Sequence, residues 1–403
     1  MTAQQHTGNG RPVTGRRQYR FLFVMAMILG KKTACQNLRA AITPIEDVES
    51  TWITIDMPPA GRAARWPLLS RSHSLAFGLV ARAEVRRLLS SGERYDAVFF
   101  NHILPAVFLG RLRKSVPCVD SMDATPLSLL RHGQAYYETQ RRPGASAIRA
   151  LKNRRARSLF MNSACLLPYS RFTMGSLVQD YGIPEEKIRV VAPGVSLEAW
   201  PGRAGTERVP GAPVRVLFVG GDFTRKGGDI LAAVARRKEF EGYEFHFVSP
   251  GAPGGRTGNV IVHNGVNANS RAMLDLYRAS DIFALPTRAD FGPTNAVCEA
   301  MAMELPVITT PVGGLDEIVA DGINGHIIPT GDADALAARL QRLGHDPGLR
   351  WRMGAQARET IRTRFNILTN ARVIVDCLKA AAGAGSARES SLQTPASLAA
   401  AYE

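Results

Sequence analysis

Short runs of β-branched and aromatic residues alternate with longer helical patterns along most of this 403-residue chain. In the first half we expect strands at residues 19–25, 52–55, 97–100, 118–121, 165–168 and 188–191. In the second half we expect strands at residues 214–219, 243–248, 260–263, 281–285, 307–309 and 326–328. Helical patterns separate many of these runs, for example at 74–89, 172–181, 229–237, 270–280, 294–303 and 333–343. This alternation predicts parallel sheets that are covered by helices on both faces.

A Pro/Gly-rich stretch at residues 201–213 divides the pattern into two sets. Since the chain is also longer than one hydrophobic core supports, we expect two α/β, Rossmann-like parallel-sheet domains facing a cleft. Their predicted ranges are 18–200 and 214–379, and the last helix of the second range is a candidate to cross back to the first domain. The polar start (1–17) and the Ala/Ser/Gly-rich end (380–403) are predicted to be disordered tails. Ligands of such folds bind at the carboxyl ends of the strands.

The net charge of +15 restricts the class of partner. Basic residues gather in the first half, around Arg82, at 141–142 and at 149–157. A solvated helix face, an anionic membrane surface and an anionic substrate all fit this distribution. Nucleic acid is not expected as a partner, because no aromatic–basic interleaving or known binding motif occurs.

Cysteine usage and hydropathy indicate the compartment. The five cysteines are odd in number and lack C-x-x-C spacing, which argues for a reducing cytoplasm and against disulfides or zinc. No apolar run approaches the roughly 20 residues that span a bilayer. We therefore expect a cytoplasmic protein, with peripheral attachment to the inner face of the cytoplasmic membrane as the alternative that the basic first half leaves open.

Residues 282–331 are the most informative stretch for function. An apolar strand there runs into a Pro/Gly turn, and a short, otherwise apolar helix carries one acid, Glu299. A buried carboxylate is costly unless it is hydrogen-bonded, so this acid is expected to meet a polar partner. Glycine-rich turns between strands and helices, such as Gly313-Gly314, suit a phosphate because free N–H groups and the helix dipole point there. The stretch predicts a site for a polar, phosphorylated ligand.

Three further segments invite a ligand-binding interpretation. The loop at 220–228 contains Arg225 and Lys226 and follows a strand, but it matches neither the P-loop nor the G-x-G-x-x-G pattern. Gly30-Lys-Lys-Thr33 lacks the upstream glycine of a P-loop and is interpreted as a simple strand-to-helix turn bordering the cleft. Asp332-Ala-Asp334 resembles a D-x-D metal motif, yet it opens a helix, where capping by acids is favoured over a metal.

Taken in order, these pieces resemble the large family of retaining, nucleotide-sugar-dependent glycosyltransferases of family 4, also called glycosyl transferases group 1, which have the GT-B fold. The resemblance covers residues 166–365 well and the first half only loosely. The matching segments are 188–195, 216–220 with Lys226-Gly227, 276–286, 299–302, 305–308, 313–314, 321–322 and Gly325.

The resemblance implies a role for each matching position in the second half. Lys226 would bind the donor diphosphate, and Glu299 would hydrogen-bond the hydroxyls of the donor ribose. Phe291, Gly292 and Thr294 would line the sugar and phosphate site through backbone N–H groups.

It also implies three roles elsewhere. Val266 would lie near the base, and Gly30 would approach the diphosphate from the other domain. Asp123 falls where many relatives have a His-Asp pair that faces the sugar. His102 is interpreted as a plain loop histidine.

The sequence departs from the family pattern at three places. The family pairs its acids as E-x7-E, but Phe291 stands at the first acid position, with Asp290 directly before it as a candidate substitute. Gly221 stands where an arginine is usual, which leaves Arg225 as its replacement. Met122 stands where the family has the histidine of the His-Asp pair, directly before Asp123.

The resemblance implies a retaining transfer from a nucleoside diphosphate sugar to an acceptor hydroxyl, on a glycan, a lipid-linked or a small-molecule acceptor. Arg225 and Lys226 would stabilise the leaving diphosphate, so no metal or other cofactor is expected. Two alternatives stay open: a donor-binding pseudoenzyme or scaffold, and a synthase that accepts a sugar phosphate.

Overall fold

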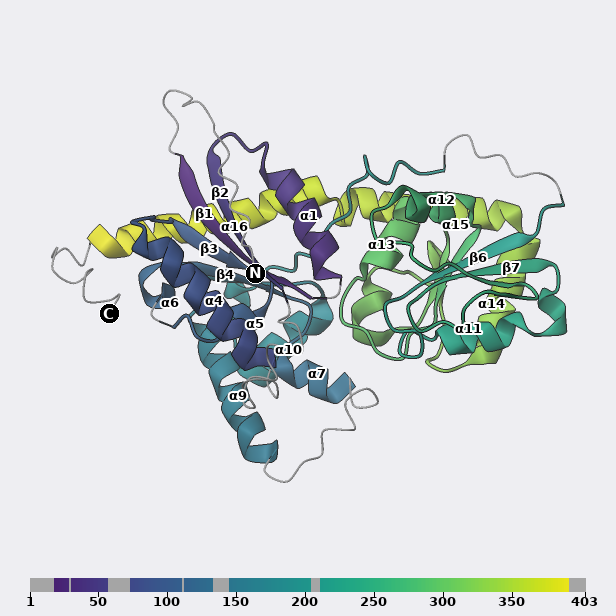
Figure 1. Ribbon diagram of the computed structural model, residues 1–403, viewed down its shortest axis with the longest axis horizontal. Helices are drawn as coiled ribbons and strands as arrows, with labels where there is room; N and C mark the ends of the chain where they lie inside the picture. The colour runs from purple at the N-terminus through teal and green to yellow at the C-terminus, as the bar shows by residue number, and fades with distance from the viewer. Residues whose placement is uncertain are drawn as a thin grey trace.

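Two separate sheets organise the computed structural model, which describes residues 18–28, 30–56, 73–110, 112–132, 145–203 and 211–390 (Figure 1). The first sheet has the order β2-β1-β3-β4-β5 and is parallel throughout. Its strands are β1 (Tyr19–Met27), β2 (Val48–Asp56), β3 (Ala97–Phe100), β4 (Cys118–Met122) and β5 (Cys165–Pro168). The second has the order β12-β11-β10-β6-β7-β9-β8 and is parallel except for the last pair. The predicted two-domain α/β architecture is confirmed.

The apolar character of β1 explains its place inside the first sheet. Residues 21–26 are all buried, as expected for a strand that is covered on both faces. Leu22 and Val24 pack on one side, and Phe21 and Phe23 pack on the other, because successive side chains alternate. The first side is covered by α4 (His73–Ser90), α5 (Ile103–Ala106), α6 (Leu112–Ser115), α9 (Ala145–Met161) and α10 (Arg171–Tyr181). The second is covered by α1 (Lys31–Ile42) and α16 (Ile367–Ser390), while α7 (Pro126–His132) packs between α9 and α10.

The second sheet is built on one continuous apolar core. Its strands are β6 (Val214–Val219), β7 (Tyr243–Val248), β8 (Arg256–Thr257), β9 (Val260–Val262), β10 (Ile282–Leu285), β11 (Val307–Thr309) and β12 (Gly325–Ile327). Its helices are α11 (Gly228–Ala235), α12 (Arg271–Ala279), α13 (Asn295–Ala302), α14 (Ala333–His345) and α15 (Pro347–Arg364). Asp332 caps α14, where its side chain accepts from the N–H groups of Asp334 and Ala335.

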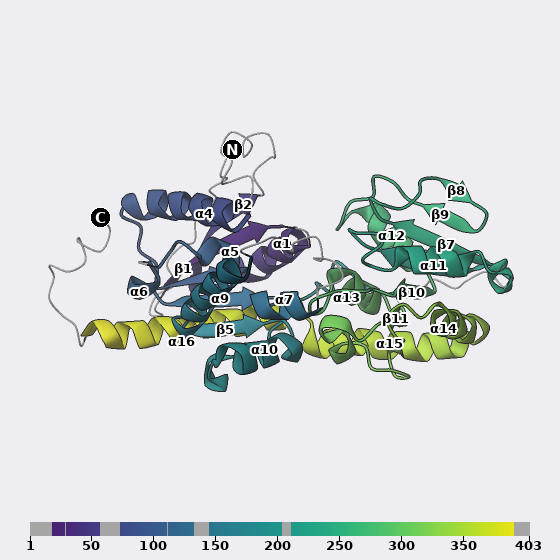
Figure 2. The same ribbon diagram turned by 90° about the horizontal axis from the view of Figure 1, so that it is seen from below.

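The chain returns to the first domain through its last helix. After α15, residues 366–367 pair with Val195, and α16 then packs on α1, β3 and β4. Lys379 Nζ lies 2.6 Å from Asp47 Oδ2, near the start of β2. Figure 2 shows α15 and α16 following one another along the same side of both domains. The last helix therefore connects the two domains and completes the core of the first.

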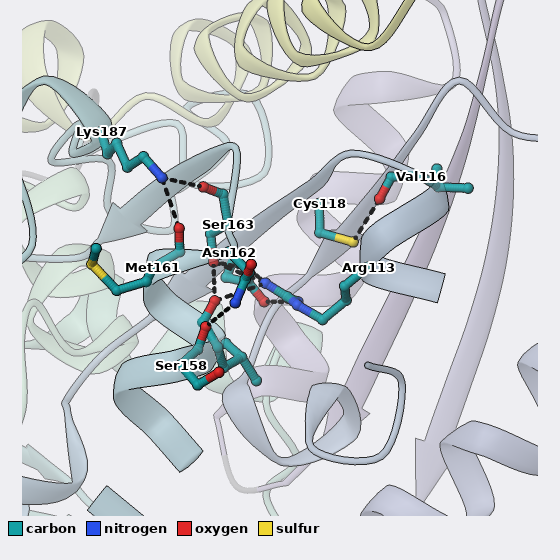
Figure 3. Close-up of polar contacts among 10 residues, drawn as sticks. Arg113, Val116, Cys118, Ser158, Met161, Asn162, Ser163 and Lys187 are labelled. Atoms are coloured by element: carbon teal, nitrogen blue, oxygen red, sulfur yellow. Dashed lines mark hydrogen bonds and ion pairs between the residues drawn. The ribbon is translucent and has the colours of Figure 1, made fainter. Parts of the chain in front are cut away.

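A buried ion pair joins α6, β4 and the end of α9 in the first domain (Figure 3). Arg113 donates to both carboxylate oxygens of Asp120, at 2.9 and 2.6 Å, and both side chains are almost fully buried. Ser163 Oγ donates to the same carboxylate at 2.7 Å. Lys187 donates to the carbonyl of Met161 at 2.8 Å, where a cation suits the C-terminal end of α9.

Two predicted segments differ from the structure. Residues 188–191 form no strand: they make a single bridge to Leu166 and two backbone bonds to the edge of β5, while Arg189 and Val190 are exposed. The predicted disordered tail is helical through Ser390, because its alanines favour helix and Ala381 and Ala382 are buried against the first domain. Residues 391–403, the tail at 1–17 and positions 204–210 of the linker lie outside the described residues.

None of the helices within the described ranges combines the length and the apolar character that crossing a bilayer requires.

Candidate active site

Four neighbouring strands of the first domain each end at a polar side chain of one cluster. Lys31 follows β1, His102 follows β3, Asp123 follows β4 and Tyr169 follows β5. Lys31 Nζ lies 3.2 Å from Asp123 Oδ2 and 3.5 Å from the hydroxyl of Tyr169. Because carboxyl ends of parallel strands meet at one edge, the sheet brings together residues that are far apart in the sequence.

The charged side chains of this cluster differ in solvent exposure. Lys31 is buried, whereas the side chain of Asp123 is 34% exposed. Burial would raise the pKa of Asp123, but the charge of Lys31, together with the neighbouring His102 and the hydrogen bonds to the carboxylate, outweighs burial and holds this pKa below its usual value. Burial, and then the charge of Lys31, lowers the pKa of His102 to about 4. The cluster thus presents an ionised carboxylate beside a neutral histidine near pH 7.

The loop between β6 and α11 positions the two predicted cations of the second domain. Lys226 Nζ forms an ion pair with Asp290 Oδ2, and Arg225 donates to the carbonyl of Ala289 at 2.8 Å. Gly227 has a φ of 78°, and a Cβ there would lie 2.0 Å from the carbonyl oxygen of Pro286. Only glycine fits this position, so the loop is held tightly against the end of β10.

The surroundings of Lys226 shift its pKa away from that of an ordinary lysine. Burial, reinforced by the neighbouring charge of Arg225, lowers the pKa of Lys226 although Asp290 opposes the shift. Two cations meet the carboxylates of Asp290 and Asp222 here. A further anion at this point would relieve the repulsion between the cations.

The segment from Asp290 to Thr294 leads into α13. The side chain of Thr294 caps the helix by accepting from the N–H of Val297 at 3.4 Å. Gly292 has a φ of 71°, and its N–H donates to the carbonyl of Gly313 at 2.6 Å. That N–H is therefore already used inside the protein, which differs from the expectation that it lines the phosphate site. Phe291, between these residues, is half-buried.

Glu299 is buried on α13, as the sequence predicts for an acid in an apolar helix. The hydroxyl of Tyr277, on α12, donates to Glu299 Oε2 at 3.1 Å. Burial raises the pKa of Glu299 to about 7, and the Tyr277 hydrogen bond opposes this shift. At neutral pH the group is thus close to half ionised, and hydroxyl donors of a ligand would favour the charged form.

Direct contacts join the two domains beside these groups. Asn295 Nδ2, in the first turn of α13, donates to the carbonyl of Gly30 at 2.9 Å. A Cβ at Gly292 would lie 3.1 Å from the Cβ of Tyr169. Glu317 accepts from the N–H groups of Arg171 and Phe172, at 2.7 and 2.8 Å, and so caps α10 from the other domain.

The structure brings most of the predicted site residues to this boundary. Gly30 meets the start of α13, Asp123 joins the Lys31 cluster, and Asp290 pairs with Lys226. Val266 lies half-buried against the second core in the loop between β9 and α12, and Asn269 of the same loop donates to Gln36 of the first domain at 3.4 Å.

Sequence reasoning missed Lys31, Tyr169, Tyr277 and Asn295. The two lysines at the start of α1 gave the one local sign of a functional position, since cations oppose the helix dipole at that end. No local sequence pattern marked the two tyrosines or the asparagine as site residues.

Two family models match the chain. Residues 213–346 match the model described as glycosyl transferases group 1, and residues 48–194 match the glycosyl transferase 4-like domain. The matched ranges correspond to the two domains of the structure.

Known relatives agree with these models. The chain is 32% identical over 209 residues to the putative colanic acid biosynthesis glycosyltransferase WcaL of Salmonella typhimurium, covering 47% of this chain and 50% of that protein. It is 32% identical over 208 residues to a D-inositol 3-phosphate glycosyltransferase of Kribbella flavida, covering 45% and 49%. The chain thus spans about half the length of these curated relatives.

Solved structures share the fold. Sucrose-phosphate synthase from Thermosynechococcus elongatus superposes with a TM-score of 0.71 at 17% identity, covering 91% of this chain and 100% of that one. Anabaena Alr3699/HepE, solved in complex with UDP-glucose, gives 0.63 at 16% identity, covering 90% and 100%.

Proposed function

The chain belongs to the group 1 glycosyltransferases, and on that premise we propose that it moves a sugar from a nucleoside diphosphate sugar to an acceptor hydroxyl in glycan, glycolipid or glycoconjugate biosynthesis. The observation that carries the proposal is that the elements bearing these groups touch across the domain boundary. The helix of Glu299 contacts Gly30 through Asn295, and Gly292, two residues after the Lys226 partner Asp290, approaches Tyr169 of the Asp123 cluster. The second domain supplies the half-buried cations Arg225 and Lys226 for a diphosphate, and the first supplies the Asp123 carboxylate for a sugar.

Each group has a proposed task. Lys226 releases Asp290 and binds the donor diphosphate together with Arg225, and Glu299 accepts hydrogen bonds from the ribose hydroxyls. Stabilising the leaving group in this way is often worth several kcal/mol in other enzymes. These side chains take the part that a metal has in other transferases, so we propose that no metal or other cofactor is required. Asp290 faces the sugar once Lys226 has left it.

We propose that the anomeric configuration of the sugar is retained. The support is the order of the family motifs from residue 188 to Gly325, which matches retaining members. Closure of the two domains around the donor would keep water from the reacting carbon. Measuring the anomer of the first product by its proton coupling constant tests this point, and an inverted product would refute it.

The acceptor is proposed to be anionic or membrane-bound. Exposed basic side chains cover α9, which extends toward the bottom of the first domain in Figure 1: Arg149, Lys152, Arg154, Arg155 and Arg157. Leu151 is 52% exposed among them. Each cation near an anionic leaflet contributes about 1 kcal/mol, so we propose peripheral attachment on the cytoplasmic side. Flotation with anionic and neutral liposomes, repeated after charge reversal at Arg154 and Arg155, tests this attachment.

A second candidate function is a synthase whose acceptor is a phosphorylated small molecule. The relative from Kribbella flavida favours it, because that protein is a D-inositol 3-phosphate glycosyltransferase. A third is a scaffold that binds the donor without turnover, as the missing first acid at Phe291 suggests.

One assay separates these functions. The protein is incubated with UDP-, GDP-, ADP- and dTDP-sugars, and the released nucleoside diphosphate is measured. Membrane lipid extract, oligosaccharides and sugar phosphates are supplied as separate acceptor arms. Release that depends on one arm and is lost in Glu299→Ala supports transfer and identifies the acceptor class. Binding without release in any arm would favour the scaffold.

A further inference from the structure

The first turn of α1 breaks a local rule of helix design. It begins with Lys31 and Lys32, contains no acidic residue, and its N-cap Gly30 provides no side-chain hydrogen bond. Cations are unfavourable at the N-terminal end of a helix, because they oppose the helix dipole. Departures from local preference often mark a functional position.

The ammonium group of Lys31 is directed into the protein, where it joins three strand ends. Its Nζ lies 3.2 Å from Asp123 Oδ2, donates to the carbonyl of Asn101 at 3.4 Å, and lies 4.9 Å from the ring centroid of Tyr169. Lys31 itself is only 7% exposed. Its neighbour Lys32 is exposed and is thus a natural internal control.

We propose that Lys31 is a positioning residue of the sugar end of the site, and that it holds the Asp123 carboxylate ionised and fixed in orientation for a sugar hydroxyl. The inference rests on the proposed function, since it assigns part of the same site.

The residue in the family's histidine position does not compete for this role. Met122 is 1% exposed and packs in the apolar core beneath the sheet. Lys31, from another strand end, is the cation that faces Asp123. The pair also differs from Arg113–Asp120, in which both side chains are buried: Asp123 keeps a third of its side chain exposed, so its carboxylate remains open to a ligand.

Two groups act directly on Asp123, Lys31 from α1 and His102 after β3, while Tyr169 after β5 contacts Lys31. His102 Nδ1 accepts from the N–H of Leu104 at 3.1 Å, so the neutral ring carries its proton on Nε2. With Asp123 as an acceptor and His102 as a donor, the cluster can bind the hydroxyl groups of a sugar. Lys31 favours the ionised form of Asp123 and adds to the burial that keeps His102 neutral.

Calorimetric titration tests the inference between pH 5 and pH 8, with UDP-glucose and GDP-mannose and with UDP and GDP that carry a methyl ester on the terminal phosphate. The methyl esters carry the same charge as the nucleotide sugars at every pH, because their terminal phosphate no longer titrates at about pH 6. The quantity of interest is the sugar increment, which is the ratio of the Kd of the methyl ester to the Kd of the corresponding nucleotide sugar. In the wild type the increment stays constant, since Asp123 is ionised throughout. In Lys31→Met the pKa of Asp123 rises, so the increment falls about tenfold at pH 5 and recovers at pH 8. Asp123→Asn loses it at every pH, and Lys32→Met keeps the wild-type profile.

Several results would overturn the inference. If the sugar increment of Lys31→Met equals that of the wild type at every pH, Lys31 does not position Asp123 and has only a structural role at the start of α1. A wild-type increment that already falls between pH 8 and pH 5 refutes it even if Lys31→Met does not fold. If the wild type binds nucleoside diphosphates and the Lys31→Met profile is unchanged, only this inference fails. If the wild type binds neither nucleotide, the proposed function fails and takes the inference with it.

Discussion

Each domain places a fully or largely buried lysine side chain against an aspartate at the domain boundary, but the two pairs are not equivalent. Lys31 faces Asp123 in the first domain, and Lys226 faces Asp290 in the second. The pKa of Lys31 lies above its usual value, because Asp123 and Tyr169 outweigh the effect of burial. The pKa of Lys226 lies below its usual value, because burial and the adjacent Arg225 outweigh Asp290.

The difference teaches how one type of ion pair can serve two purposes. The charge of Lys31 is well compensated, so the pair is a stable unit that keeps Asp123 in one state. The charge of Lys226 is under-compensated, since a second cation shares its carboxylates. Such a cation gains by exchanging a carboxylate for the greater charge of a diphosphate.

The largest effect is expected at a third pair, which lies away from the boundary. Arg113→Met leaves Asp120 buried without its partner and should lower the free energy of unfolding by roughly 3 to 5 kcal/mol. Calorimetric melting measures this loss. The double variant Arg113→Met/Asp120→Leu should recover much of it, because no unpaired charge remains. If Arg113→Met melts at the same temperature as the wild type, burial of the Arg113–Asp120 pair does not make it important for stability. Arg113–Asp120 could then not serve as the reference for the two pairs at the boundary.

Glu299→Gln separates stability from function. Since burial raises the pKa of Glu299 from 4.5 to about 7, its contribution to stability is present below pH 4.5 and is lost as the pH rises through 7. Glutamine carries no charge, so the ligand-free variant should be more stable than the wild type at pH 8, by roughly 1 to 3 kcal/mol, and nearly equal at pH 5.

Denaturant midpoints at the two pH values measure this prediction. The same variant should bind nucleoside diphosphates more weakly. A variant that is less stable at pH 8 would show that Glu299 has a structural role instead.

A smaller effect is expected at the partner of Lys226. Asp290→Asn removes the carboxylate with which a diphosphate competes, so nucleoside diphosphates should bind about tenfold more tightly, which is about 1.4 kcal/mol. Sugar transfer should nevertheless fall, if Asp290 also faces the sugar. Calorimetry and the nucleotide-release assay measure the two quantities. Weaker binding in Asp290→Asn would mean that Asp290 orients Lys226 and does not compete for it.

The parts of the molecule that could be predicted are those whose residues lie close together in the sequence. Strands such as β5, β6 and β11 were predicted with the correct bounds, because each is a short apolar run between turn residues or helices. In the second domain, residues 282–331 contain Asp290, Glu299, Gly292 and the Gly313-Gly314 turn, so one continuous stretch indicated most of that half of the site.

The first half of the site could not be predicted in the same way. Lys31 and Tyr169 are 138 positions apart, and only the parallel pairing of β1, β3, β4 and β5 brings them together. The hydroxyl of Tyr277 reaches Glu299 through packing between α12 and α13, which no local pattern encodes. The prediction of a strand at 188–191 was wrong because a local pattern was present without the matching tertiary pairing. The β-branched residues of this segment suit a strand, but the segment makes only isolated backbone contacts with the edge of β5.

The most direct test of the central claim is the affinity of one nucleoside diphosphate for the wild type, Lys226→Met and Lys31→Met, with Lys238→Met as an exposed control. UDP and GDP are titrated into each protein at pH 7.5 by calorimetry. The account predicts that Lys226→Met loses binding by roughly tenfold to a hundredfold, because a charge-assisted contact is removed, while Lys31→Met and the control match the wild type. Equal losses in the two boundary variants, or a Lys226→Met protein that binds as the wild type does, would contradict it.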